Sequence, residues 1–429
     1  MQPGFLGKFL SVNLFGCALL VLAGCGNFKS LKQDQENLAE ERFLTSVTVE
    51  DKTQSGQPFV VVYLGDADGS RILDAIPLSK PDSFEIWLAA GDGWIFAFTD
   101  ANGDGRFQKE ESYGWGNEGE PILAQDQKSV QLYVPIQNAG SGQMPPPPKL
   151  VDQPVYELGK LRFRKSGEVA NPSDARFSQE AAVRGLWQPY AFLHEGNTGL
   201  FFVQPFDPQK TPVLFVHGIE GDPAQFNYLI DFLDQDRYQF WFLNYPSGLY
   251  LKTISDSLFY LVEEVRREFG FKKIHLIAHS MGGLVARSYL ARCQEQAACG
   301  YIDTFISIAS PFNGVESAAK GVKHAPAYAP SWMDLAPDSE FLSELFDKAL
   351  PVPTQHYLMF TYHLDQSIGA LAYIESGDGV IPLHSQLRKE AQQQAIQIMG
   401  FDQTHVGVLS DPALADTIGR ILYRADYGR

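Results

Sequence analysis

A serine lies between an apolar run and a helical pattern in residues 274–287. The run 274–278 is largely apolar, Ser280 follows it, and Ala278 and Gly282 leave little bulk on either side. A strand that turns sharply into a helix presents the serine hydroxyl outward, and small neighbours let the backbones approach closely. A serine hydroxyl is a weak nucleophile, so it needs a base to take its proton and an acid to orient that base. The spacing therefore predicts nucleophilic catalysis by Ser280.

The acid and the base for Ser280 are expected beyond the ends of later strands. Asp378 lies in a glycine-flanked turn, Gly-Asp-Gly-Val-Ile-Pro, after an apolar run. His405 follows the run that ends near residue 399 and precedes the final helix. Asp365 competes as the acid and His384 as the base, although His384 lies on the same predicted loop as Asp378. Asp378 and His405 are the preferred pair.

A tetrahedral oxyanion needs two preorganised backbone donors. The residue after the nucleophile, Met281, is one candidate. The other should come from the loop after the first strong strand, which reads Phe-Val-His-Gly-Ile-Glu-Gly over residues 215–221.

At this point the chain resembles the α/β-hydrolase lipases and esterases, over about residues 185–429. The motifs that carry the resemblance are residues 212–221, the serine turn at 278–287, the turn at 377–382 and the late His405. One departure is Ala278, where a glycine is more usual. The resemblance implies that the N–H of Ile219 is the second oxyanion donor and that His217 braces its loop.

The resemblance also implies a lid over residues 310–352, which are rich in proline and aromatic residues. Such a lid would cover an apolar acyl pocket. An excursion with a small core of its own is the alternative interpretation.

The expected activity is hydrolysis of a carboxylic ester, with a lipid or other ester as substrate and no cofactor in catalysis. Lipase, phospholipase and esterase activities all fit. An acyltransferase uses the same groups, and a non-catalytic binding lipoprotein on the same scaffold is the alternative from another class.

Strand and helix patterns alternate after residue 184. Continuous apolar runs indicate strands at residues 213–216, 239–243, 274–278, 305–309, 357–361 and 395–399, with helical spacing at 223–233 and 254–269 between them. This alternation predicts an α/β fold, a doubly wound and mainly parallel sheet, with the site beyond the carboxyl ends of its strands.

The first third of the chain has a different pattern. Short β-branched or aromatic runs at residues 47–49, 59–64, 84–88, 94–99 and 130–134 are separated by Gly, Asp, Asn and Pro. They predict a small antiparallel β-sandwich-like domain over residues 46–138. Residues 25–45 are expected to form a polar tether. Residues 139–184, which open with Gly, Ser and four consecutive prolines, are expected to connect the sandwich to a hydrolase domain at 185–429.

Within the predicted sandwich, residues 100–111 match the spacing of a calcium loop. The candidate ligands are Asp100, Asn102, Asp104, Arg106 and Glu111, with Gly105 at the sharp bend. The flanking segments are not helical in pattern, so this is no EF-hand. A structural calcium site and a plain turn rich in Asp and Asn remain the two interpretations.

Residues 9–23 form a mostly apolar run after Lys8, and the run ends in Leu-Ala-Gly-Cys at Cys25. It is shorter than the roughly 20 residues that cross a bilayer as a helix, so it is typical of a cleaved signal peptide. The small residues before Cys25 resemble the lipobox of bacterial lipoproteins. The resemblance implies removal of residues 1–24, a lipid such as palmitate on Cys25, and anchoring in the cell envelope, with the outer membrane favoured because no Asp follows Cys25.

Once Cys17 leaves with the signal and Cys25 carries lipid, Cys293 and Cys299 remain. In an oxidising envelope they can form a local disulfide, although two free thiols fit the spacing nearly as well. The formal charge of −17 comes from scattered acids, without a basic stripe to follow a phosphate backbone. Nucleic acid is therefore not an expected partner, and the sequence does not indicate an oligomeric state.

Overall fold

The structure is a computed structural model of the 429-residue chain. It describes residues 26–36, 42–78, 83–89, 93–122, 130–141, 144–153, 165–296, 298–363 and 376–428. The predicted signal peptide and Cys25 lie outside these residues. None of the described helices is both long enough and apolar enough to cross a membrane.

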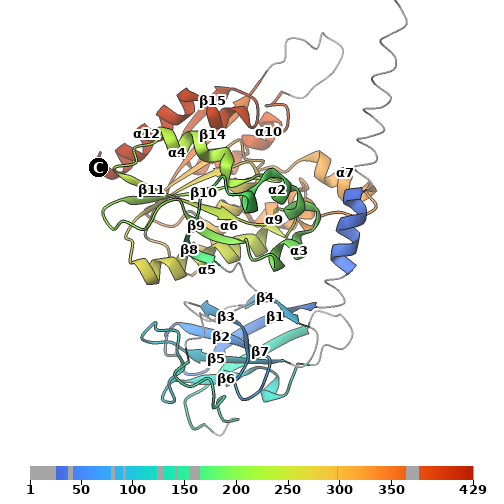
Figure 1. The fold of residues 1–429 in the computed structure, drawn as a ribbon, viewed down its shortest axis with the longest axis vertical. Helices are drawn as coiled ribbons and strands as arrows, with labels where there is room; N and C mark the ends of the chain where they lie inside the picture. Colours follow the sequence, from blue (N-terminus) through green and yellow to red (C-terminus); the bar gives the residue numbers. More distant parts are fainter. Residues whose placement is uncertain are drawn as a thin grey trace, which may run out of the picture.

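Two small sheets form the first region (Figure 1). One has the order β4-β1-β7 and the other β3-β2-β5-β6. Their strands are β1 (Arg42–Asp51), β2 (Phe59–Leu64), β3 (Ile72–Leu78), β4 (Ser83–Ala89), β5 (Trp94–Thr99), β6 (Tyr113–Trp115) and β7 (Val130–Ile136). Side chains such as Val47 and Val134 of the first sheet share a core with Phe59 and Val61 of the second. The other face of the second sheet packs on Phe107 of the loop that follows β5.

The sequence patterns missed β3 and β6, and one pairing differs from the all-antiparallel expectation. β1 and β7 run parallel, with Val47 opposite Leu132. β6 has only three residues, too few to show an alternating pattern, and β3 contains a proline and an aspartate that weaken its strand signal.

Residues 26–36 form a helix, in the segment for which the sequence predicts a polar tether. Its inward face includes Leu31, which is fully buried, and Asp34, which is nearly so. This helix packs on Leu186 and Ala329 of the later region, so its partners are far away in the sequence. Figure 1 shows it, in blue, beside α7.

The second region is built on an eight-stranded sheet with the order β15-β14-β13-β12-β10-β11-β9-β8. The strands are β8 (Lys165–Val169), β9 (Gly199–Phe202), β10 (Thr211–Val216), β11 (Tyr238–Asn244), β12 (Ile274–His279), β13 (Ile302–Ile308), β14 (Gln355–Tyr362) and β15 (Ala395–Asp402). All neighbours run parallel except β9 and β11. The predicted mainly parallel sheet is confirmed, and its six predicted strands are β10 to β15.

The sheet begins earlier than expected, because β8 lies inside the segment assigned to the connecting linker. β8 reads Lys-Ser-Gly-Glu-Val and β9 has four residues, so neither carries the long apolar run that marks the central strands. Pairing with the sheet, rather than local pattern, makes β8 a strand.

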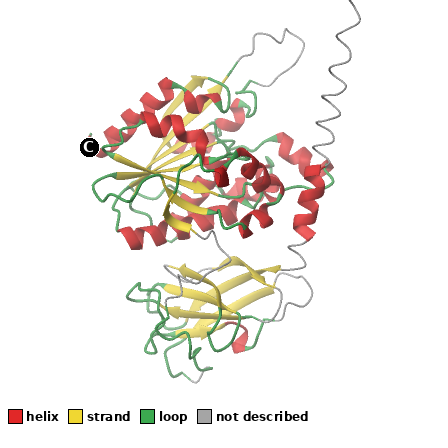
Figure 2. Ribbon diagram, viewed as in Figure 1, coloured by secondary structure: helices red, strands yellow, loops and turns green. Residues whose placement is uncertain are grey.

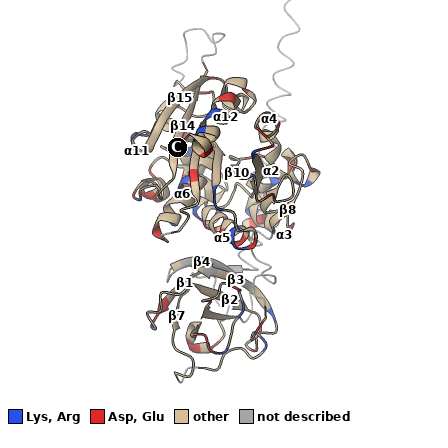
Figure 3. Ribbon diagram, turned by 90° about the vertical axis from the view of Figure 1, so that its left-hand side faces the viewer, with Lys and Arg blue, Asp and Glu red and all other residues tan. Residues whose placement is uncertain are grey.

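Helices cover both faces of this sheet (Figure 2). α5 (Leu251–Phe269) and α6 (Met281–Glu295) share one core with the sheet, and α4 (Asn227–Phe232) and α12 (Pro412–Tyr427) share another. The shorter helices are α2 (Gln179–Trp187), α3 (Pro189–His194), α7 (Glu316–His324), α8 (Pro330–Leu335), α9 (Glu340–Glu344), α10 (Leu383–Gln386) and α11 (Lys389–Gln394). Figure 3 shows basic and acidic residues interspersed over elements of both regions.

Candidate active site

Ser280 stands in a tight turn between β12 and α6. Its φ of 55° is in the left-handed region, which a non-glycine residue adopts only where its surroundings hold it. Its backbone N–H donates to the Ile308 carbonyl at 2.8 Å. A Cβ added at Gly282 would lie 2.3 Å from the His217 oxygen, and one at Gly218 would lie 2.7 Å from the Ser280 Cβ. Glycine at both positions therefore lets the serine turn approach the loop after β10.

His405 joins Ser280 to Asp378. The His405 Nε2 lies 2.8 Å from the Ser280 Oγ, and its Nδ1 lies 2.7 Å from the Asp378 Oδ2. Because a carboxylate only accepts hydrogen bonds, Nδ1 donates to Asp378 and Nε2 is left to accept the serine proton. All three side chains are buried. The structure therefore brings together the three residues that the sequence nominated.

The Asp378 carboxylate accepts several hydrogen bonds besides the one from His405. Its Oδ1 accepts from the backbone N–H groups of Val380 and Ile381 at 3.0 and 2.7 Å. Its Oδ2 accepts from the Thr361 hydroxyl at 2.6 Å and the Gln386 amide at 3.3 Å. Burial by itself would raise the pKa of this carboxyl, but its hydrogen bonds, led by that from His405, hold the pKa below the ordinary value of 3.8.

Thr361 and Gln386 were not identified from the sequence. The Gln386 amide also donates to the Thr361 carbonyl at 3.0 Å and accepts from the Thr361 N–H at 2.8 Å, so the two residues form a closed pair behind Asp378. Thr361 is near the end of β14 and Gln386 is in α10. No local motif marks either position, because their role depends on the folded loop.

The backbone of His405 is also held. Its N–H donates to the Asp378 carbonyl at 3.2 Å, and its carbonyl accepts from the His279 Nε2 at 2.9 Å. Burial, with the neighbouring His405, lowers the pKa of His279 to about 3, so His279 is neutral at ordinary pH. His279 precedes the serine directly, and its adjacency to Ser280 was the only signal that it might contribute.

Of the two competing residues, the structure describes His384. His384 has an exposed side chain in α10, and its carbonyl accepts from the Asn313 amide at 2.8 Å. Asp365 lies outside the described residues.

The two predicted oxyanion donors belong to residues next to the serine turn: Met281 follows Ser280, and Ile219 follows Gly218, on which an added Cβ would lie 2.7 Å from the Ser280 Cβ. Met281 begins α6, and Ile219 belongs to the loop after β10. Neither N–H has a hydrogen-bond acceptor in the part of the chain that the structure describes. The ring of His217 donates from Nδ1 to the Gly218 carbonyl at 2.9 Å and stacks on Tyr245, with ring centroids 4.1 Å apart. Burial lowers the pKa of His217 to about 4, which suits a neutral structural residue.

The predicted lid segment, residues 310–352, contains α7, α8 and α9. Its apolar side chains Phe312, Leu335, Leu342 and Leu345 are buried in the main core. Met333 is exposed. A mobile cover stays a prediction. The alternative was an excursion with a small core of its own, whereas these four side chains pack in the main core.

In the acidic loop, three of the predicted calcium ligands accept hydrogen bonds from the backbone of the loop. Asn102 Oδ1 and Asp104 Oδ1 accept from backbone N–H groups of the loop, and an Asp100 oxygen accepts from the Gly105 N–H at 3.1 Å. Within the described ranges, no group of three or more His, Cys, Asp or Glu side chains is placed to hold a metal ion. These oxygens help to close a turn, and a calcium site at this loop stays a prediction. Burial first, and then the Asp100 and Asp104 charges, raise the pKa of Glu111 to about 7, although a backbone hydrogen bond lowers it in part.

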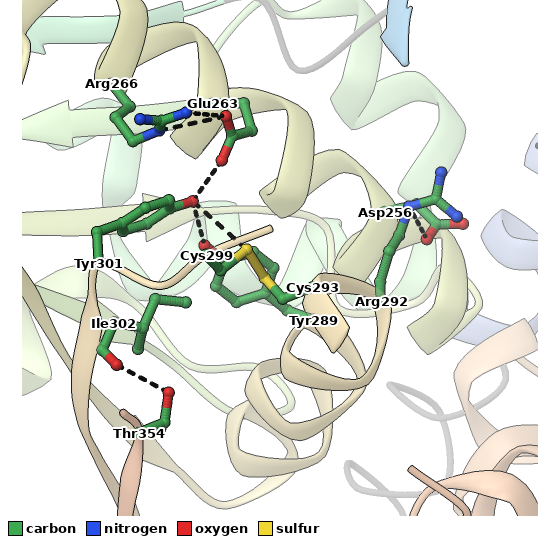
Figure 4. The surroundings of a disulfide bond; sticks show 10 residues. All are labelled: Asp256, Glu263, Arg266, Tyr289, Arg292, Cys293, Cys299, Tyr301, Ile302 and Thr354. Carbon is green, nitrogen blue, oxygen red and sulfur yellow. Dashed lines mark hydrogen bonds and ion pairs between the residues drawn. A yellow bond between two sulfur atoms is a disulfide. The ribbon is translucent and has the colours of Figure 1, made fainter. Parts of the chain in front are cut away.

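Cys293 and Cys299 form a disulfide that joins the last turn of α6 to the chain just before β13 (Figure 4). Both residues are buried. The Tyr301 hydroxyl lies against the Cys299 sulfur at 3.6 Å and donates to Glu263 at 2.6 Å. Of the two possibilities left by the spacing, the structure has the disulfide.

Comparison with known proteins gives a family match inside this region. Residues 211–335 match the family model described as alpha/beta hydrolase fold. The chain is also 31% identical over 110 residues to the lysosomal thioesterase PPT2-B of Xenopus laevis. That match spans 24% of this chain and 36% of the thioesterase, so it covers just over a third of that relative's length.

Solved structures that resemble the chain include two lipases and the protein Est1E. The mature lipase BlEst2 of Bacillus licheniformis has a TM-score of 0.41 and 17% identity, over 52% of this chain and 97% of its own. Lipase B of Aspergillus fumigatus has a TM-score of 0.38 and 16% identity, over 61% of this chain and 62% of its own. Est1E from Butyrivibrio proteoclasticus has a TM-score of 0.39 and 12% identity, over 53% of this chain and 93% of its own.

The family match, the strand order and the serine turn between β12 and α6 lead to one assignment. From β8 to α12 the chain has the α/β-hydrolase fold, and residues 211–335 of this α/β-hydrolase domain match the family model.

Proposed function

We propose that this protein hydrolyses carboxylic esters through an acyl-serine intermediate. The observation that supports the proposal is the continuous chain of hydrogen bonds from Ser280 through His405 to Asp378. A buried serine with a base and an orienting carboxylate is the arrangement that activates a hydroxyl for attack on a carbonyl.

In the first half of the proposed reaction, the Ser280 Oγ attacks the ester carbonyl carbon and its proton passes to the His405 Nε2. The carbonyl electrons move to oxygen, and the resulting oxyanion accepts from the N–H groups of Ile219 and Met281. Asp378 stabilises the imidazolium that forms. The tetrahedral intermediate then expels the alkoxide, which takes the proton from His405 and leaves as the alcohol.

In the second half, water replaces the alcohol. His405 takes a proton from the water, whose oxygen attacks the acyl carbon and forms a second oxyanion in the same place. Collapse of this intermediate breaks the bond to the Ser280 Oγ, which regains the proton from His405. The carboxylic acid is released and the enzyme is restored.

The test is turnover of p-nitrophenyl butyrate by the wild type and by Ser280→Ala, His405→Ala and His384→Ala. The first two should lose several orders of magnitude in kcat, because members of such a triad act as a unit. His384→Ala is the matched control and should retain activity. Full activity in His405→Ala, or loss in His384→Ala alone, would contradict the assignment.

Apolar side chains beside the proposed site favour an apolar acyl group. Ile219, Val380 and Val406 lie within two residues of the loop glycine, the acid and the base, and their exposed fractions are 36%, 61% and 59%. An acyl chain that covers them would remove this surface from water. A series of p-nitrophenyl esters and phospholipids should show kcat/KM rising with acyl length. Equal values from acetate to decanoate would argue for a substrate of another kind.

A thioester is a second candidate substrate, because the Xenopus laevis relative is named a thioesterase. The triad chemistry attacks either carbonyl, so the leaving group decides. Oxoester and thioester substrates with the same acyl chain, measured on the same preparation, separate the two. We expect the oxoester to have the higher kcat/KM, and a reversed order would favour the thioester.

We also propose that the mature protein is anchored to the bacterial envelope through a lipid on Cys25. Wild-type cells should incorporate labelled palmitate into the protein, and Cys25→Ser should abolish the label and leave an uncleaved or mislocalised precursor. Equal label in both would exclude this anchor.

A further inference from the structure

Glu220, the residue that follows the proposed oxyanion donor Ile219, is held at three points. Its N–H donates to the Ser247 hydroxyl at 3.1 Å, and its carbonyl accepts from the Gln179 amide at 3.0 Å. Its carboxylate accepts from the indole Nε1–H of Trp187 at 3.0 Å. Glu220 also has a φ of 48°, a left-handed conformation that a glutamate keeps only when its surroundings hold it.

Two of the three side chains that hold Glu220 come from the two ends of one helix. Gln179 is the first residue of α2 and Trp187 is the last. The carboxyl end of this helix packs on the loop after β11, where the Gly248 N–H donates to the Gly185 carbonyl at 3.0 Å. α2 therefore connects the oxyanion loop to its neighbour.

Trp187 is in turn supported by the amino-terminal helix, residues 26–36. The rings of Phe28 and Trp187 meet edge to face, with centroids 5.1 Å apart. Trp332 of α8 completes the cluster, with its ring 5.6 Å from that of Trp187. Such contacts fix the plane of the indole and so the direction of its N–H.

The same helix also fixes the start of α3, directly after Trp187. The two Asp34 oxygens accept from the N–H groups of Tyr190 and Ala191, each at 2.9 Å. Gln188, the N-cap of α3, provides no capping side chain of its own. Asp34 therefore supplies the cap from more than 150 residues away, and the corner between α2 and α3 depends on it.

From these contacts we infer that Trp187 is a positioning residue for the oxyanion hole, acting through Glu220 on Ile219, and that the amino-terminal helix supports it. This inference rests on the proposed ester hydrolysis. If the indole bond to Glu220 is lost, the loop can leave its strained conformation and the Ile219 N–H moves away from the oxyanion. The cost falls on the transition state, because the ground-state ester carries less charge on that oxygen.

The experiment compares full-length variants that differ by one hydrogen bond. Trp187→Phe keeps a ring and removes the N–H donor. Glu220→Leu removes the acceptor, whereas Glu220→Gln keeps an oxygen that can accept. Trp94→Phe, the same substitution in the first region, is the matched control. The measurements are kcat and KM for p-nitrophenyl butyrate, and inhibition by phenylboronic acid, whose adduct with serine is tetrahedral like the transition state.

We expect Trp187→Phe and Glu220→Leu to lower kcat by about tenfold to a hundredfold with KM nearly unchanged, and to weaken boronate binding in parallel. Glu220→Gln should restore most of the activity. Phe28→Ala should give a smaller loss of about threefold to tenfold in kcat, because it loosens the indole without removing its bond.

If Trp187→Phe keeps the wild-type kcat and boronate affinity, the inference about Trp187 is wrong, while the proposed ester hydrolysis still stands. The inference is also wrong if the Trp187→Phe preparation contains fewer active molecules but these bind boronate with normal affinity. That result is expected when a residue only supports folding. If Trp187→Phe fails to fold, Glu220→Leu against Glu220→Gln decides the same question at a partly exposed side chain. Absence of turnover and of boronate binding in the wild type would overturn the proposed function, and this inference with it.

Discussion

The two small sheets and the α/β-hydrolase domain differ in what they bury. All nine histidines of the chain lie at or after His194, and five of them are buried in the hydrolase domain. In the first region, the described core is mainly aliphatic and aromatic, with Phe96 in ring contact with Phe107 and Trp115. Its buried polar residues are few: Thr45, Thr99 and Asp100.

The difference shows what each core needs. Aromatic and aliphatic packing stabilises the first region with few buried polar groups, since burying a polar group costs free energy unless it is hydrogen-bonded. The hydrolase domain accepts that cost at the carboxyl ends of its strands, where Ser280, Asp378 and His405 meet. The pKa values of Asp378 and of the nearby His217 and His279 are lowered, and such clusters of shifted groups are typical of functional sites.

The largest expected effect is on activity and comes from Asp378→Asn, which should lower kcat by about 10⁴-fold. An asparagine has no charge to stabilise the imidazolium and does not fix the same ring tautomer. The matched control is Asp402→Asn, at an exposed residue that ends β15 and pairs with His363 at 3.4 Å. Steady-state kinetics on both variants make the comparison. Near-normal activity in Asp378→Asn would mean that this carboxylate is structural.

The next effect is on stability as the pH falls, and it should differ between the two regions. Burial lowers the pKa of His217 to about 4 and those of His279 and His356 to about 3, from an ordinary 6.5. Below pH 6.5 these histidines bind protons in the unfolded chain but stay neutral in the folded domain. Stability is therefore complete above pH 6.5 and is lost as the pH falls toward 4, by about 2 kcal/mol for each histidine between pH 6.5 and 5.

Other groups act in the opposite direction. In the first region Glu111, with a pKa raised to about 7, favours folding as it becomes protonated between pH 7 and 4.5. Burial raises the pKa of Asp334 to about 6, so its protonation offsets part of the loss of stability in the hydrolase domain. Hydrogen exchange of the full chain at pH 7, 6 and 5, corrected for intrinsic rates, should show loosening of the hydrolase domain and none of the two sheets. Equal loosening of both would contradict the assignment of neutral buried histidines.

Removal of the disulfide should have a smaller effect, confined to the hydrolase domain. The bond closes a short loop with a sequence separation of 6, for which chain entropy gives a stabilisation of about 2 kcal/mol. The double variant Cys293→Ala/Cys299→Ala should lower the urea midpoint of this domain and leave kcat nearly unchanged, because the bond lies at the far end of α6 from Ser280. An unchanged midpoint would show that the cross-link contributes nothing.

The smallest expected effect is that of calcium on the first region. The oxygens of Asn102 and Asp104 already accept hydrogen bonds from the loop, so we expect melting in millimolar calcium and in EDTA to agree. An occupied site would add roughly 2.7 kcal/mol at a hundred times its dissociation constant. A stabilisation of this size by calcium in the wild type, absent in Asp104→Ala, would support the calcium site that the loop spacing predicts.

Much of the hydrolase domain was predictable because its signals are local. The run at residues 274–278, the serine and the small residues around it fix a strand, a turn and a helix within fourteen positions of the sequence. Central parallel strands are covered on both faces, so they read as continuous apolar runs. Asp378 and His405 could be nominated from their order and from the strands before them.

Other features had no local signal. β8 is a strand through its pairing with β9, and the helix at residues 26–36 lies in a polar segment that was interpreted as a tether. A helix with only one narrow apolar face gains most of its stability from the surface it packs on. Leu31 has such a surface only after residues from 186 to 332 have folded beside it.

The sequence by itself determined which residues could react and the elements that carry them, because side-chain chemistry and the periodicities of strand and helix are properties of neighbouring residues. Only the tertiary structure decided which partners those residues have. Thr361 and Gln386 donate hydrogen bonds to Asp378, and Trp187 donates one to Glu220. These contacts join loops and helices that meet only when helices pack on both faces of the sheet. Hydrogen bonds of this kind depend on distance and direction in space, which no spacing along the chain specifies.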